Sequence, residues 1–359
     1  MRRPPTVAEA LARPHNGFSA LRLALALAVV VSHAASVASG NALDEPLARA
    51  TGFTLGEHAV NGFFAVSGFL VTMSFDRRGL RDYLLARTLR ILPGLVAAAL
   101  VVALVLGPAM SVLPVPEYLR DANVWRFIRG TLTTFKSNAA LPGVFPGNPY
   151  RSPLGTVWTL KYEVLCYLGV VAVGLLGALR RPWPVPLVAL GFAAALMVAD
   201  ARHPVLPKGL ETALRLPLIF SVGAALYAAR DRLRLSVLPL LGLGLACLLL
   251  HATPLYRALL FVAEGYGAVW LALLPGLARP VLDPPADLSY GIYLYGWPIQ
   301  QSLHALWPAA DGARLLLPAL VLTVPVAAAS WYGVERPALR LKARALGRRT
   351  LGTIEPAGP

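Results

Sequence analysis

Long apolar stretches separated by short polar connections recur along the whole chain, and they constrain its fold more than any other feature. Hydrophobic residues make up 57% of the 359 residues and charged residues only 14%, which excludes an ordinary soluble protein. About 20 apolar residues in a helix cross the ~30 Å hydrocarbon core of a bilayer. We therefore expect an all-α, polytopic membrane protein with ten transmembrane helices, near 17–38, 59–75, 89–110, 155–178, 184–200, 211–228, 235–251, 257–274, 287–306 and 314–332.

The arginines predict how these helices are oriented. Short connections rich in arginine stay on the cytoplasmic side. Arginines precede the first stretch, follow the last one, and fill the second, fourth and sixth connections, for example at Arg77, Arg180 and Arg230. Both termini are therefore expected in the cytoplasm. The long connection 111–154 is expected outside, with a short helix near 117–136 followed by an irregular segment broken by proline and glycine.

The formal charge of +15 fits this orientation signal together with attraction to anionic membrane lipid. The basic residues are dispersed over loops, so no nucleic-acid binding is expected. Cys166 and Cys247 both lie in apolar stretches, which makes a disulfide framework or a metal site unexpected. We expect residues 1–340 to form one membrane domain and 341–359 a flexible basic cytoplasmic tail. The arginine-rich, lysine-poor composition is typical of a GC-rich bacterium, whose inner membrane is the predicted location.

The first stretch carries two cationic residues, Arg22 and His33, eleven positions apart. Eleven steps of ~100° return to nearly the same helix face, and ~1.5 Å per residue places the two side chains roughly 16 Å apart along the axis. Ionisable groups inside a membrane are costly and usually mark a pathway or a reaction site. We predict that both residues are functional.

Two further segments carry candidate chemistry before the long loop. In 58–70, Gly62, Ser67 and Gly68 suit either close helix packing or a site that includes Ser67. Arg87 and Arg90 are spaced i, i+3 on the predicted cytoplasmic side, and such a pair suits a polyphosphate because guanidinium groups bind phosphate oxygens bidentately. The alternative is a simple anchor at the cytoplasmic membrane surface.

Three segments after the loop add polar residues to apolar helices. Trp158 suits the membrane interface, whereas Glu163, two turns into its helix, suits either a proton acceptor or a structural ion pair with Lys161 or an arginine of another helix. Tyr290 and Tyr293 precede a proline and suggest a bent helix with inward hydroxyls. Glu335 and Arg336 are expected to end the last helix.

The order of these segments resembles the acyltransferase family 3 membrane proteins, typified by bacterial O-acetyltransferases of surface polysaccharides. Arg22 and His33 are similar to the arginine, ten residues, histidine signature of that family. Further similarities are Phe63-Phe-Ala-Val-Ser-Gly-Phe69, the pair Arg87 and Arg90, Trp158-Thr-Leu-Lys-Tyr-Glu163, Ser289-Tyr-Gly-Ile-Tyr-Leu-Tyr-Gly-Trp-Pro298 and Glu335-Arg-Pro337. Gly296 stands where many members have a histidine, so a mechanism that needs a second histidine is not expected here.

The resemblance implies transfer of an acyl group, expected to be acetyl, from cytoplasmic acyl-CoA to a hydroxyl of an exported or lipid-linked carbohydrate. Acyl-CoA would be a co-substrate, and no bound cofactor is expected. His33, Arg22 and Glu163 are then the predicted catalytic residues. His33 would act as a general base or carry the acyl group. Arg87 and Arg90 would hold coenzyme A phosphates, and the acceptor or donor would contact Ser67, Trp158, Tyr290 and Tyr293. The alternative class is a multi-pass transporter of a glycolipid or an anionic metabolite.

Overall fold

The computed structural model describes residues 3–203 and 205–345, and this part of the chain is built from helices without strands. Each of the ten predicted segments coincides with a helix or with half of one. The helices are α2 (Phe18–Ser39), α4 (Leu55–Val101), α8 (Leu160–Leu175), α9 (Pro184–Arg202), α10 (Lys208–Ala228), α11 (Leu238–Leu249), α12 (Leu255–Ala272), α13 (Ser289–Leu306) and α14 (Gly312–Ser330).

Six helical segments in the described residues are long and apolar enough to cross a membrane, as expected of a multi-pass membrane protein. They are Phe18–Ser39, Leu55–Met110, Val157–Leu175, Pro184–Arg202, Lys208–Ala228 and Gly312–Leu341. α11 has only 12 residues, a rise of ~18 Å, and is too short to span the bilayer alone. The count of ten transmembrane helices stays a prediction.

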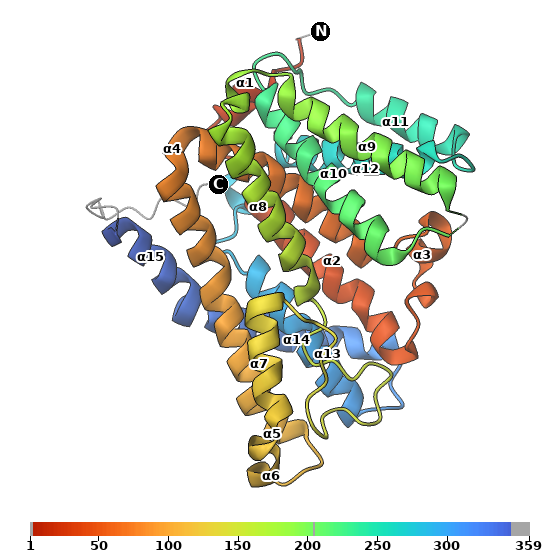
Figure 1. The fold of residues 1–359 in the computed structure, drawn as a ribbon, viewed down its shortest axis with the longest axis vertical. Helices are drawn as coiled ribbons and strands as arrows, with labels where there is room; N and C mark the ends of the chain where they lie inside the picture. The colour runs from red at the N-terminus through yellow and green to blue at the C-terminus, as the bar shows by residue number, and fades with distance from the viewer. Residues whose placement is uncertain (1–2, 204, 346–359) are drawn as a thin grey trace.

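α4 contains both the second and the third predicted segment. Its only non-helical residue is Gly79, whose φ of 76° suits glycine and bends the helix sharply, as Figure 1 shows. The apolar run continues through one π-helical turn (Val102–Leu106) into α5 (Gly107–Met110). Two apolar helices are thus joined without an irregular loop.

The connection predicted to be external begins with two short helices instead of the single predicted one. Asp121 separates α6 (Val115–Arg120) from α7 (Ala122–Thr134) and caps α7 by accepting a hydrogen bond from the backbone N–H of Asn123. Tyr118 anchors α6 to the π-helical turn after α4, since its hydroxyl donates to the carbonyl of Ala103 at 2.7 Å. Pro108 has no N–H to occupy that carbonyl. Burial raises the pKa of Tyr118 to about 12, so the hydroxyl stays protonated and remains a donor.

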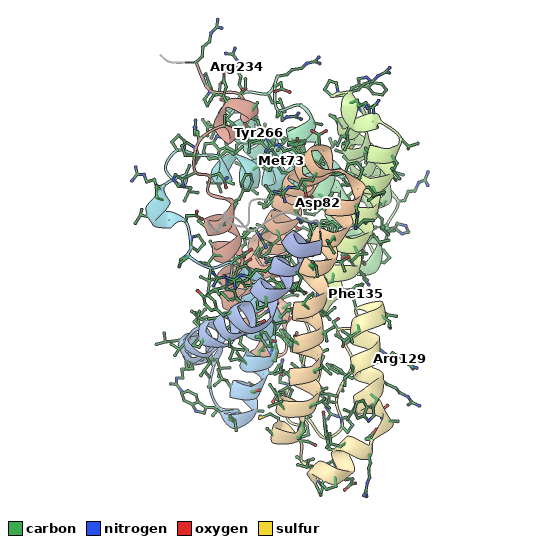
Figure 2. All side chains as sticks on the ribbon, turned by 90° about the vertical axis from the view of Figure 1, so that its left-hand side faces the viewer. Met73, Asp82, Arg129, Phe135, Arg234 and Tyr266 are labelled. Carbon is green, nitrogen blue, oxygen red and sulfur yellow. The ribbon has the colours of Figure 1, made fainter. Side chains whose placement is uncertain are left out.

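The N-terminal segment is hydrogen-bonded to the connection before α11 and to the residue that follows α12. The backbone N–H of Val7, the first residue of α1 (Val7–Leu11), donates to the carbonyl of Leu233 at 2.9 Å, and Arg13 donates to the carbonyl of Leu273 at 3.0 Å. These segments were all predicted on one side of the membrane. Figure 2 shows Arg234 at one end of the molecule and Arg129, in the predicted external loop, in the opposite half.

α2 packs against α4, α13 and α14, and α4 also packs against α10. Small residues allow the closest of these contacts. A Cβ added at Gly68 would lie 1.9 Å from the carbonyl oxygen of Phe220, and one added at Gly223 would lie 2.0 Å from that of Ala65. The packing interpretation of the 58–70 segment therefore holds for Gly68.

The last apolar helix does not end at Glu335, and that expectation was wrong. α14 passes through a π-helical turn (Trp331–Glu335) into α15 (Arg336–Ala345), which continues to the end of the described residues. Glu335 is 2% exposed. Most of the tail predicted over 341–359 lies outside the described residues.

Candidate active site

Arg22 and His33 both face the chain around α13. Arg22 Nη1 donates to Asp287 Oδ2, two residues before α13, at 2.9 Å. The His33 ring meets the Trp297 ring edge-on, with 4.9 Å between centroids. The imidazole is partly exposed and its nitrogens make no hydrogen bond within the described residues, so they are free to meet a substrate.

An ion-pair cluster links α2 and α4 to the chain just before α13 and to the π-helical turn after α14. Arg90 Nη2 lies 2.8 Å from the same Asp287 Oδ2 that binds Arg22, and Arg90 Nη1 lies 3.9 Å from Glu335 Oε2. Ser289 donates to Asp287 Oδ1 at 2.6 Å, and Ser330 donates to Glu335 Oε1 at 2.9 Å. We call Arg22, Arg90, Asp287 and Glu335 the arginine cluster.

Arg87 lies one turn before Arg90 on α4 but has different neighbours. Its guanidinium is 5.8 Å from the centroid of the Tyr167 ring, and it makes no ion pair with a carboxylate of the described residues. Arg87 Nε is buried and has no hydrogen-bond partner there. Buried N–H donors are normally paired, so this one is a candidate for contact with a ligand.

Glu163 lies in a small polar group between α4 and α8. It accepts hydrogen bonds from the hydroxyl of Tyr167 and, at 3.4 Å, from that of Ser67. Within the described residues it has no ion pair with Lys161, whose ammonium instead lies 4.8 Å from the Tyr162 ring centroid. Because Tyr167 touches both Glu163 and Arg87, this polar group adjoins Arg87.

The remaining predicted contacts are dispersed. Tyr290 donates to the carbonyl of Ile91 at 2.9 Å, and its ring centroid lies 5.6 Å from the Arg90 guanidinium, so it borders the arginine cluster. Tyr293 lies 2.7 Å from the hydroxyl of Thr159 and donates to a backbone carbonyl at 2.8 Å. Trp158 packs edge-on against Tyr162, with 6.2 Å between centroids, and is not brought to His33 or to the arginine cluster.

Packing explains why position 296 carries no histidine. A Cβ added at Gly296 would lie 2.7 Å from Val30 Cγ2 on α2. A side chain there would therefore push α13 away from the helix that carries His33.

Sequence reasoning missed two residues of the site, Asp287 and Tyr167. Asp287 follows a Pro-Pro-Ala sequence in a connection with one arginine, Arg279, and looks like an ordinary loop residue. Tyr167 lies one helical turn after Glu163, which places both on one face of α8. Neither residue belongs to one of the sequence motifs quoted above.

A second buried charged cluster ties α4, α10 and α12 together. Arg215 is 0% exposed, lies 2.7 Å from Glu211 through Nε and donates to Asn61 at 3.0 Å. Asn61 donates to Glu264, which also contacts His58. Arg215 forms ion pairs with Glu57 and Glu211, although its Nε and Nη2 make no aligned hydrogen bond within the described residues. Opposite charges that face one another in this way are the pattern of an internal brace between helices.

Comparison with known proteins shows the family of the chain. Residues 15–332 match the family described as an acyltransferase domain. The chain is 30% identical to nodulation protein 10 of Rhizobium leguminosarum bv. viciae, over 93% of this chain and 96% of that protein. It is 25% identical to an O-acetyl transferase of Shigella phage Sf6, over 80% of this chain and 85% of that protein. No solved structure matches.

The apolar helices and the paired charges between them define a multi-pass membrane protein with a polar site inside the bundle. The chain belongs to the acyltransferase family 3, as the resemblance predicted. It is an O-acyltransferase enzyme.

Proposed function

We propose that this enzyme transfers an acetyl group from acetyl-CoA to a hydroxyl of an exported carbohydrate or glycolipid at the bacterial inner membrane. The observation that carries the proposal is the alignment, along one face of α2, of an accessible histidine above a cluster of arginines. A donor that carries several phosphates needs cationic side chains such as arginines, and a reacting hydroxyl needs a group such as histidine that accepts its proton.

The arginines support a donor that carries several phosphates. Arg87 has a buried, unpartnered Nε, and Arg90 lies one turn away. Guanidinium groups at this spacing can each take phosphate oxygens bidentately. The phosphates would then be held at the predicted cytoplasmic side. The pantetheine arm would extend along α2 toward His33, past the polar group of Glu163, Ser67 and Tyr167.

His33 supports transfer to a hydroxyl at the other end of that path. One imidazole nitrogen accepts the hydroxyl proton as the oxygen attacks the thioester carbonyl. The C–O bond forms, the C–S bond breaks, and the thiolate leaves with the electron pair of the C–S bond. The imidazolium then returns the proton to the thiolate. The edge-on contact with Trp297 fixes the ring orientation for both steps.

The test replaces His33 in the full chain. Loss of a general base typically costs ~10² to 10⁴ in rate, so H33A should lose at least about a hundredfold of the radiolabelled acetyl transfer from acetyl-CoA to membrane glycans. Mass spectrometry of surface glycans should show the acetyl-sized mass disappear in cells that carry H33A. H251A is the matched control, because His251 is exposed in a turn after α11. Undiminished transfer by normally expressed H33A would refute the role of His33.

A further inference from the structure

A single carboxylate oxygen holds two arginines of different helices. Asp287 Oδ2 lies 2.9 Å from Arg22 Nη1 and 2.8 Å from Arg90 Nη2. The other oxygen, Oδ1, accepts the hydroxyl of Ser289. The Asp287 and Arg90 side chains are each 14% exposed, so their attraction is only partly screened by solvent.

The two contacts differ in quality. The approach of Arg22 is aligned as a hydrogen bond, whereas Arg90 Nη2 is buried and makes none in spite of its short distance to the carboxylate. The attraction between Arg90 and Asp287 is therefore mainly charge on charge. A charge-based contact without alignment is the easier one to exchange for another anion.

The charge balance also favours such an exchange. Arg22, Arg87 and Arg90 carry three positive charges, and two carboxylates of the described residues, those of Asp287 and Glu335, form ion pairs with them. Glu335 stands 3.9 Å from Arg90 and is engaged by Ser330. The arginines can therefore accept additional negative charge.

We propose that Asp287 is a displaceable counter-ion: it holds Arg90 until a phosphate of the donor takes its place, while Arg22 keeps its hydrogen bond to Asp287. This inference rests on the proposed donor, a phosphate-bearing acyl thioester. Asp287 acts through Arg90 and is a positioning residue. It lowers the affinity of the empty site for phosphate and lets the product leave when the carboxylate recaptures Arg90.

The experiment compares binding of coenzyme A and of pantetheine, which lacks all phosphates, to the purified full chain. D287N keeps the size of the side chain but frees Arg90, so the Kd for coenzyme A should fall about tenfold while that for pantetheine stays unchanged. Adding R90A to D287N should abolish the gain. D311N is the control, because it removes one negative charge at an exposed helix start.

The outcomes separate this inference from the proposed function. A wild-type protein that does not bind coenzyme A would refute the donor itself. Wild-type binding with an unchanged or raised Kd in D287N would refute the counter-ion alone, and so would an equal gain for pantetheine. If D287N does not fold, S289A removes the hydrogen bond to Oδ1 and should lower the Kd for coenzyme A about threefold, a change that would again be absent for pantetheine.

Discussion

Arg87 and Arg90 share one turn of α4 but differ in what surrounds them. Arg90 is placed between Asp287 and Glu335, whereas Arg87 lies over an aromatic ring with a buried donor left unpaired. The i, i+3 spacing predicts that both point the same way, and it cannot reveal which carboxylates reach them from distant parts of the chain. Their functions should therefore separate on substitution.

At the scale of these residues, we expect different consequences from R87A and R90A. R87A should raise the KM for acetyl-CoA roughly tenfold or more, because it removes a charge-assisted contact, and should leave thermal stability unchanged. R90A should raise the KM and also lower the Tm, because Glu335 and Asp287 lose a buried partner. Steady-state kinetics and thermal unfolding in detergent check both. R81A, an exposed arginine of the same helix, is the control, and equal Tm values for R87A and R90A would contradict the distinction.

The candidate site was predictable where a single helix or a short spacing defines it. The common face of Arg22 and His33 follows from eleven steps of one helix. Asp287 contacts Arg22 from 265 positions away, through a packing of α13 on α2 that no local pattern encodes. Helix packing also explains why Trp158 lies apart from the other predicted site residues, because its orientation depends on how α8 packs.

At the scale of helices, the contact between α4 and α10 depends on glycine. Helices in a membrane gain little from the hydrophobic effect, so their association relies on close packing. The approximate positions of the apolar helices were predictable from apolar length alone, but several of their ends were not. The continuity of α4 through Gly79 and of α14 into α15 was not, because arginine-rich connections look alike in sequence whether they are helical or irregular.

We expect G68A to weaken that contact. The added methyl would lie 1.9 Å from the backbone oxygen of Phe220, which cannot move aside like a side chain, and such overpacking costs ~1–3 kcal/mol. The Tm in detergent should fall accordingly. G191A tests the specificity of the effect, since no atom lies within 4 Å of a Cβ there and alanine favours a helix. A Tm of G68A equal to that of the parent would show that α4 and α10 can separate without cost.

At the scale of the whole molecule, two exposed arginines mark opposite halves. Arg234 and Arg129 are both exposed and lie in opposite halves of the molecule (Figure 2). The predicted orientation assigns the end with Arg234 to the cytoplasm and the loop with Arg129 to the outside. This assignment determines which side of the membrane supplies the donor.

Cysteine labelling tests the orientation. In a background with Cys166 and Cys247 replaced by alanine, a membrane-impermeant maleimide should label R129C in intact cells and R234C only after permeabilisation. Both natural cysteines are buried, so their replacement should be tolerated. Labelling of R234C in intact cells would reverse the orientation and would place the arginine cluster on the outer side.

The π-helical turn at Trp331–Glu335 places one more residue in its turn than an α-helix would. Each residue advances an α-helix by ~100° around its axis. The extra residue therefore sets which face of α15 is turned toward the bundle. The inward direction of Glu335 is therefore governed by how many residues precede it as much as by their identity. In a relative one residue shorter at this place, an identical glutamate would face elsewhere, so an alignment of letters alone would assign it the wrong neighbours.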